Sequence, residues 1–162
     1  MPLITRPVGE SDVPAILRLV QALADYEKLP PPDEAARARL AADLFTSPPR
    51  LEALIAELDG EVVGYAAHFM TYSTFRAQPT LYLEDLFVHP SARGKGAGSA
   101  LFDACARKAL ERGCGRYEWQ VLAWNTPAMD FYLRKGATKL ADWVPFRLEG
   151  EALRAYAQAP GR

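Results

Sequence analysis

The sequence predicts one domain of mixed α/β (α+β) class, with a central sheet of about seven strands flanked by helices. Short apolar runs that suit strands alternate along the chain with stretches whose apolar residues recur at helical spacing. No internal repeat, low-complexity segment or interdomain linker interrupts the 162 residues, so we expect residues 1–162 to fold as a single domain. A composition of 49% hydrophobic and 24% charged residues is ordinary for a globular protein.

The first third of the chain predicts a strand and two helices. Residues 3–6 are a short strand. Ser11 is the expected cap of a helix that ends before three consecutive prolines at 30–32, which cannot continue it. Asp33 and Glu34 begin a second helix that runs to about residue 45.

The middle of the chain predicts three strands. Residues 52–58 and 61–70 are joined by Asp59-Gly60, a strong hairpin signal. We expect residues 71–79 to form a polar connection and residues 80–88 to form the next strand.

The last third predicts helices and strands that are separated by glycines at 113, 115 and 136. Asn125 is the expected cap of one of these helices. The expected elements are a helix over 98–112, a strand over 116–123, a helix over 126–134, strands over 137–140 and 144–148, and a helix from about residue 150.

The segment Arg93-Gly94-Lys95-Gly96-Ala97-Gly98 lies between an expected strand and an expected helix. Its glycines allow a tight turn and close approach to a ligand, and the following helix presents unpaired N–H groups that favour an anion such as a pyrophosphate. The spacing differs from the P-loop and from the Rossmann pattern. The alternative to an anion-binding loop is a glycine-rich turn that binds no ligand, and the two basic residues and the start of a helix disfavour it.

These residues carry a family resemblance. The chain resembles the GCN5-related N-acetyltransferase (GNAT) superfamily, whose acetyl-CoA loop follows R/Q-x-x-G-x-G/A, and Arg93, Gly96 and Gly98 match it. The strings LYLEDLFV at 81–88 and WNTPAMDFY at 124–132 resemble the diamine acetyltransferase branch, which includes spermidine/spermine and thialysine acetyltransferases. The resemblance covers nearly the whole chain and implies a sheet splayed between its fourth and fifth strands, with acetyl-CoA as co-substrate.

The resemblance also implies the catalytic residues. An alkylammonium with a pKa near 10 has a free lone pair in only about one molecule in a thousand at neutral pH, so the enzyme must accept a proton and return one to the thiolate. The resemblance assigns Glu84 to the amine-binding site, and we expect it to receive the amine proton directly or through a water. Tyr132 occupies the position of the general acid. The bland alternatives are a salt bridge for Glu84 and a core tyrosine for Tyr132.

Further site residues follow from the same resemblance. Strand alternation is expected to send Tyr82 and Glu84 to one face and Asp85 to the other. Glu118 and Trp119 have equally good alternatives, an exposed strand residue and a core residue. The implied cofactor-binding residues are Leu86, Phe87, Val88, Arg93, Gly94, Lys95, Gly96, Ala97, Gly98, Ser99, Asn125 and Tyr132. The implied substrate-binding residues are Tyr26, Glu27, Glu84, Asp85, Glu118, Trp119 and Gln120.

The expected activity is therefore transfer of an acetyl group from acetyl-CoA to a primary amine of a small molecule, by direct attack in a ternary complex. Arg76, Arg134 and Lys135 place positive charge where it would repel a polyamine, which favours a thialysine-like or lysine-like amino acid over spermidine or spermine. A protein or peptide N-acetyltransferase and a non-catalytic acyl-CoA-binding module are the alternatives. The branch implies a homodimer.

Other partners and compartments are not indicated. The net charge of -1 gives no field that attracts nucleic acid or an anionic membrane. The N-terminus does not resemble a signal peptide and no stretch approaches the roughly 18–20 apolar residues that span a bilayer, so we expect a cytoplasmic protein. Cys105 is expected to be a small buried hydrophobe. His68 and His89 have no ligand-spaced partner, so no metal is expected.

Overall fold

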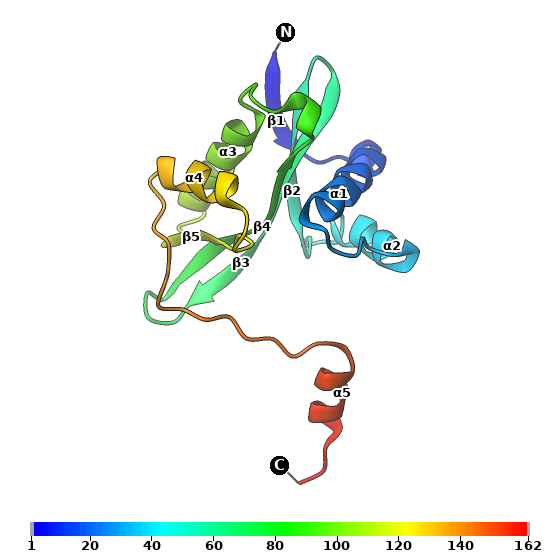
Figure 1. Cartoon of the computed structure of the whole chain (residues 1–162), viewed down its shortest axis with the longest axis vertical. Helices are drawn as coiled ribbons and strands as arrows, with labels where there is room; N and C mark the ends of the chain where they lie inside the picture. The colour runs from blue at the N-terminus through cyan, green and yellow to red at the C-terminus, as the bar shows by residue number, and fades with distance from the viewer. Residues whose placement is uncertain (1, 162) are drawn as a thin grey trace. The chain divides into compact units, whose positions relative to one another are not determined.

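The computed structural model describes residues 2–161 (Figure 1). The chain divides into two compact units, Met1–Leu122 and Ala123–Arg162, which we describe separately. Within the described residues, no helix combines the length and the apolarity needed to cross a bilayer.

One five-stranded sheet forms the centre of the first unit, where the sequence predicted about seven strands in all. Its strand order is β1-β2-β3-β4-β5, antiparallel throughout except for the last pair, β4 and β5, which is parallel. Asp59 and Gly60 adopt the left-handed backbone that the β2–β3 turn requires, with φ of 56° and 83°. The strands are β1 (Leu3–Pro7), β2 (Glu52–Leu58), β3 (Glu61–Ser73), β4 (Gln78–Val88) and β5 (Arg116–Trp119).

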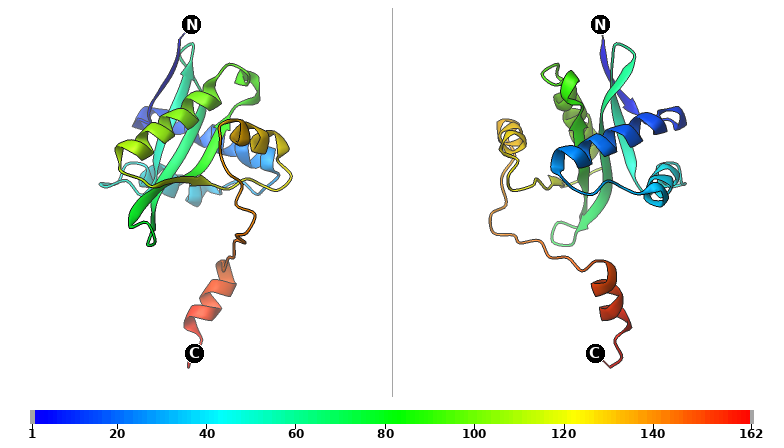
Figure 2. Two further views of the ribbon diagram at one scale, coloured as in Figure 1. Left: turned by 90° about the vertical axis from the view of Figure 1, so that its left-hand side faces the viewer. Right: turned by 45° about the vertical axis from the view of Figure 1, so that its right-hand side comes forward.

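The two long helices of the first unit cover opposite faces of this sheet. Helix α1 (Val13–Glu27) contacts β3 and β4, and α3 (Ala97–Glu111) contacts all five strands (Figure 2). On the α1 face a buried apolar cluster joins Ile16 and Leu19 to side chains of β2, β3 and β4. The remaining elements of this unit are the 3₁₀ turns η1 (Glu10–Asp12) and η2 (Pro90–Ala92) and the short helix α2 (Glu34–Asp43).

Helix boundaries were predicted well where a capping residue marks them. Asp33 caps α2 by accepting a hydrogen bond from the Ala36 N–H at 2.8 Å, as expected. Ser11 as the cap of α1 is wrong, because η1 precedes the helix and Asp12 occupies the cap position. Cys105 on α3 is fully buried, which confirms the expectation of a small buried hydrophobe.

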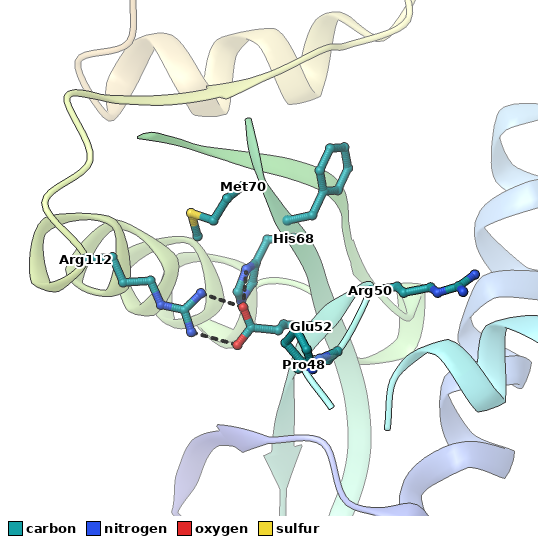
Figure 3. A pocket seen from close by; sticks show the side chains of 8 residues that line it. Pro48, Arg50, Glu52, His68, Met70 and Arg112 are labelled. Carbon is teal, nitrogen blue, oxygen red and sulfur yellow. Dashed lines mark hydrogen bonds and ion pairs between the residues drawn. The ribbon is translucent and has the colours of Figure 1, made fainter. Parts of the chain in front are cut away.

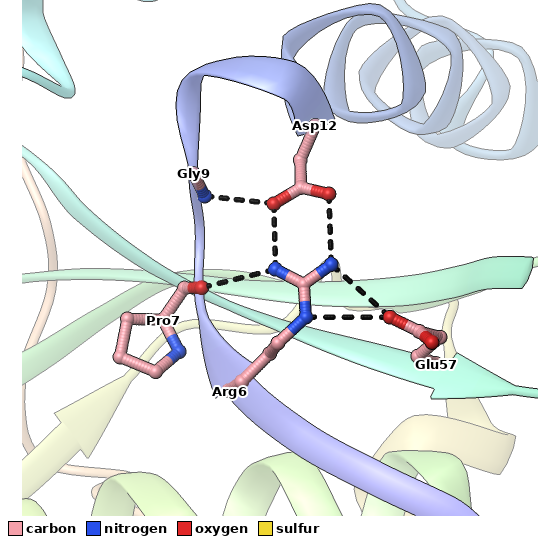
Figure 4. A network of polar contacts seen from close by, with 5 residues as sticks. All are labelled: Arg6, Pro7, Gly9, Asp12 and Glu57. Atoms are coloured by element: carbon pink, nitrogen blue, oxygen red, sulfur yellow. Dashed lines mark hydrogen bonds and ion pairs between the residues drawn. The ribbon is translucent and has the colours of Figure 1, made fainter. Parts of the chain in front are cut away.

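Arg6 joins three elements at the start of the fold (Figure 4). Its guanidinium donates to both carboxylate oxygens of Asp12, at 2.7 and 3.0 Å, and to Glu57 of β2 at 3.1 and 3.3 Å. The Asp12 side chain is 7% exposed and also accepts from the Gly9 N–H. The hydrogen bond from Arg6 is the largest cause of a lowered pKa at Asp12. This network therefore fixes β1 against β2 and against the start of α1.

Two sequence expectations about the sheet are wrong in this unit. The segment 71–79 is not a connection throughout, because β3 extends to Ser73 and β4 begins at Gln78, and these two residues pair. The last strand is shorter than predicted and ends at Trp119. Both differences have one cause: strand ends depend on cross-strand pairing, which local composition does not report.

The second unit contains α4 (Thr126–Arg134) and α5 (Gly150–Gln158). Asn125 caps α4, with its side-chain oxygen accepting from the Ala128 N–H at 3.3 Å, as predicted. The strands expected over 137–140 and 144–148 are wrong, because neither segment is a strand in the structure. An apolar extended segment becomes a strand only when another strand pairs with its backbone.

Candidate functional site

A β-bulge in β4 sets the directions of the side chains at the centre of the site. Asp85 pairs with Ala67 of β3 and Leu83 pairs with His68, so Glu84 between them has no counterpart. Tyr82 pairs with Phe69, which shares a face with Ala67 because the two are separated by one residue. Tyr82 and Asp85 therefore face α1 together, and the expected simple alternation through this strand is wrong.

Asp85 is held by a buried tyrosine. The Tyr65 hydroxyl on β3 donates to Asp85 Oδ2 at 2.9 Å. The pKa of Asp85 is raised to about 6, chiefly by burial, with the hydrogen bond from Tyr65 opposing the rise and the charges of Glu84 and Glu27 adding to it. Burial also raises the pKa of Glu27, which ends α1. Glu27, Glu84 and Asp85 therefore lie close enough to act as one group of carboxylates.

Glu84 itself is exposed. Glu118 of β5 is on the same part of the sheet, since it pairs with Tyr82. Burial first, and then the charges of Glu84 and Glu118, raise the pKa of Tyr82. Arg116 lies 3.7 Å from Glu118, a partial neutralisation of that carboxylate.

The other two substrate-binding residues predicted in this region are Trp119, the last residue of β5, and Gln120, which follows it. The Trp119 ring contacts Phe102 of α3 edge-on, with centroids 5.1 Å apart, and the Tyr117 ring at 5.0 Å. These ring contacts favour the alternative in which Trp119 is a packing residue. Gln120 is exposed just beyond β5.

The end of β4 continues past its parallel partner. Pairing with β5 runs from Thr80 to Leu83, and Leu86, Phe87 and Val88 lie beyond it, in accord with a sheet that splays between its fourth and fifth strands. Phe87 and Val88 are buried, and the Phe87 ring belongs to the cluster under α1. The Val88 carbonyl accepts a hydrogen bond from Arg93 Nε at 3.0 Å.

The glycine loop leads directly from this strand into α3. Gly94 and Gly96 have φ of 77° and 87°, values that favour glycine, and Gly96 is the residue that caps α3. The Ala100 N–H donates to the Gly96 carbonyl, so the N–H groups of Ala97, Gly98 and Ser99 precede the first hydrogen bond of the helix. Lys95 is exposed in the loop. The loop therefore has the parts of an anion site that the sequence predicted.

Arg93 points from the loop toward the end of α1. Its guanidinium carbon lies 4.8 Å from the centroid of the Tyr26 ring and 5.5 Å from that of Phe87. With its hydrogen bond to Val88, Arg93 joins the glycine loop and the end of β4 to the end of α1. Local sequence pattern missed this contact, because Tyr26 and Arg93 are far apart along the chain.

Asn125 and Tyr132 lie in the second unit. Asn125 caps α4, and the Tyr132 ring is 5.2 Å from that of Phe131. Burial raises the pKa of Tyr132 to about 12, so its hydroxyl keeps its proton at neutral pH. A protonated phenol is the form that a proton donor requires.

A separate cavity of about 490 Å³ lies where β2 begins (Figure 3). Glu52 on its wall receives a two-pronged ion pair from Arg112, with one N–O distance of 2.7 Å, which joins β2 to the end of α3. His68 is fully buried, its Nδ1 is 4.0 Å from Glu52, and neither ring nitrogen has a hydrogen-bond partner among the described residues. The lining residues are Pro48, Pro49, Arg50, Glu52, His68, Phe69, Met70 and Arg112.

Comparison with known proteins decides the family. The profile of the acetyltransferase (GNAT) family matches residues 16–137. The chain belongs to the GNAT family. It is 40% identical over 163 residues to the thialysine N-epsilon-acetyltransferase of Bos taurus, covering 94% of this chain and 95% of that protein. It is 30% identical to the L-ornithine N5-acetyltransferase NATA1 of Arabidopsis thaliana, covering 90% and 83%. This GNAT protein is therefore an N-acetyltransferase.

Solved structures agree on the GNAT fold. An integron cassette protein from the mobile metagenome of V. cholerae superimposes with a TM-score of 0.84 at 25% identity, over 98% of this chain and 99% of that one. An aminoglycoside acetyltransferase from a soil metagenomic sample, in complex with sisomicin, gives a TM-score of 0.72 at 20% identity, over 91% and 97%. The second match concerns the fold alone.

Proposed function

We propose that this protein transfers an acetyl group from acetyl-CoA to a primary amine of a small molecule, a diamine or a thialysine-like amino acid. The observation that carries the proposal is the group of carboxylates formed by Glu84 and Asp85, on the strand that leads into the glycine loop, and Glu27, at the end of α1. Carboxylates attract an ammonium group, and the loop and helix start suit the pyrophosphate of CoA. The relatives named for thialysine and ornithine acetylation support the same class of amine.

The residues present fit acetyl-CoA. Gly94 to Ser99 would hold the pyrophosphate through main-chain N–H groups, and the main chain of residues 86–88 would pair with the pantetheine arm as an added strand does. The Val88 carbonyl already accepts one hydrogen bond, from Arg93, and has a second lone pair for the pantetheine arm. Acetyl-CoA supplies the activated acetyl group, and Asn125 and Tyr132 are the proposed contacts from the second unit.

The chemistry that we propose is direct attack by the free amine in a ternary complex. Glu84 receives the amine proton, directly or through a water, because it is exposed at the bulge where the strand leaves its regular pairing. Tyr132 donates its proton to the departing thiolate. Cys105 is buried, and the rise of its pKa to about 11, chiefly by burial, disfavours the thiolate that a covalent acetyl intermediate on this residue needs.

We further propose that the protein is a homodimer in which the segment 137–148 contacts a second copy. This segment contains exposed apolar side chains, among them Trp143 at 75%, Val144 at 71% and Phe146 at 94% exposed. Residues 137–140 and 144–148 were predicted from sequence to be strands, but within the described residues neither pairs with a strand. Sedimentation at micromolar concentration should give twice the monomer mass, and Phe146→Ser should shift the population toward monomer.

The deciding experiment for the activity is release of CoA thiol from acetyl-CoA with a panel of amines: thialysine, ornithine, lysine, putrescine, spermidine, spermine and a short peptide. Saturable turnover with thialysine or ornithine would support the proposal. Turnover with the peptide alone would assign the protein to peptide acetylation, and acetyl-CoA binding without turnover would leave a binding module.

A further inference from the structure

Tyr65 presents a polar group inside an apolar core. The residue is 1% exposed and its ring lies in the cluster with Ile16, Leu19 and Phe87. A phenylalanine would serve that packing equally well, yet the Tyr65 hydroxyl reaches Asp85 Oδ2 at 2.9 Å across the β3–β4 pairing. The hydroxyl therefore needs an explanation that packing does not provide.

The surroundings of Asp85 explain it. Asp85 is half-buried, and a carboxylate that is partly withdrawn from water takes up a proton more readily unless hydrogen bonds or cations favour its charged form. Glu27 from α1 and Glu84 from β4 both raise its pKa, and only the Tyr65 hydrogen bond is found to lower it. Other polar groups on this side of the sheet are Tyr26, Tyr82 and Arg93, together with Glu118 of β5, which pairs with Tyr82 and has Arg116 beside it.

Tyr65 is suited to the role of a permanent donor. Burial, and then the nearby charge of Asp85, hold the pKa of the Tyr65 hydroxyl above its usual range, so it does not ionise at working pH. A phenol that keeps its proton donates to Asp85 and binds one of its two oxygens.

We propose that Tyr65 is a positioning residue of the amine site: it fixes one oxygen of Asp85 and keeps this carboxylate anionic, so that the other oxygen binds an ammonium group of the substrate. The inference rests on the proposed function, because it assigns Asp85 to the amine side. Tyr65 acts through Asp85 and touches no reacting atom.

The test is the pH dependence of kcat/KM for the amine in Tyr65→Phe, at saturating acetyl-CoA and from about pH 5 to about pH 9. The amine's own titration affects variant and wild type equally, so the ratio of the two profiles isolates Asp85. Loss of the donor raises the pKa of Asp85 beyond about 6. We expect the acid limb to move up by about one to two pH units, with a ratio well below one at acid pH that returns toward one at alkaline pH.

Matched variants separate this role from packing. Tyr72→Phe removes the hydroxyl of an exposed tyrosine on the same strand, and its ratio should stay near one at every pH. Asp85→Asn should remove the contribution of Asp85 to the acid limb and leave that of the amine, and adding Tyr65→Phe to it should shift nothing more. The KM for acetyl-CoA should stay unchanged in Tyr65→Phe.

The outcomes are distinguishable. A Tyr65→Phe ratio near one at every pH would mean that the hydroxyl has no role and Tyr65 only packs, and a ratio equally low at all pH values would mean that the hydroxyl does not set the charge of Asp85. Either result would make the inference wrong while the proposed function stands. A wild-type protein that acetylates no amine of the panel would overturn the proposed function and this inference with it. If Tyr65→Phe does not fold, the pH profile of Asp85→Asn decides: an unchanged acid limb there contradicts the role of Asp85 and hence of Tyr65.

Discussion

Replacement of His68 by phenylalanine should remove a pH-dependent cost from the stability of the fold. The imidazole is fully buried and neither ring nitrogen has a hydrogen-bond partner among the described residues. Burial lowers its pKa from 6.5 to about 4, with the neighbouring Glu52 opposing the shift and two cations adding to it. The folded protein therefore carries a neutral His68 at physiological pH.

The magnitude follows from the two pKa values. As the pH falls below 6.5 the unfolded chain binds a proton at this residue and the folded chain does not, so the free energy of unfolding decreases until the pH reaches about 4. At about 1.4 kcal/mol per pH unit, the loss is about 2 kcal/mol at pH 5 and roughly 3 to 4 kcal/mol once the folded histidine is protonated.

Urea denaturation of wild type and His68→Phe at pH 7 and pH 5 measures this directly. Between pH 7 and pH 5 the free energy of unfolding of the wild type should fall by about 2 kcal/mol more than that of the variant. The urea midpoint of the wild type should therefore fall by about 1 M more than that of the variant. His89→Gln, at an exposed histidine, is the control and should follow the wild type. An equal decrease in the free energy of unfolding of wild type and His68→Phe would refute the reasoning, because it would mean that His68 has the same pKa in the folded and the unfolded chain.

Three further outcomes test the site and its scaffold. Glu84→Gln should lower kcat by about 100-fold or more and change the pH profile, and full turnover with an unchanged profile would contradict its role as proton acceptor. Tyr132→Phe should lower kcat about 100-fold with little change in the Kd of acetyl-CoA, and an equal loss of both would argue against a general acid. Arg6→Met should reduce the free energy of unfolding by about 2–4 kcal/mol, because it leaves the buried carboxylate of Asp12 unpaired beside Glu57; a chemical denaturation midpoint equal to that of wild type would exclude this.

Local signals predicted much of this fold. Asp59-Gly60 marked the β2–β3 hairpin, and Asp33 and Asn125 marked helix starts, because each acts on backbone groups within a few residues. The glycine loop was recognised for the same reason. Its cap at Gly96 and the helix that follows are local consequences of glycine conformation.

Long-range pairing could not be predicted in the same way. The bulge at Glu84 exists only in the register between β3 and β4, and the hydrogen bond from Tyr65 to Asp85 depends on that register. The segment 137–148 failed as a strand prediction because apolar character reports a need for burial and not the identity of the partner.

Because Glu84 has no partner in the β3–β4 register, the regular pairing of the sheet does not depend on it. On either side of it, Leu83 and Asp85 already point to opposite faces, so omission of Glu84 would join two stretches of strand whose side chains alternate correctly. Glu84 is thus an insertion in an otherwise regular strand, tolerated by the sheet and not demanded by it. The core therefore sets no requirement on the identity of this residue, so a carboxylate at position 84 is explained by the proposed role as proton acceptor and not by the fold.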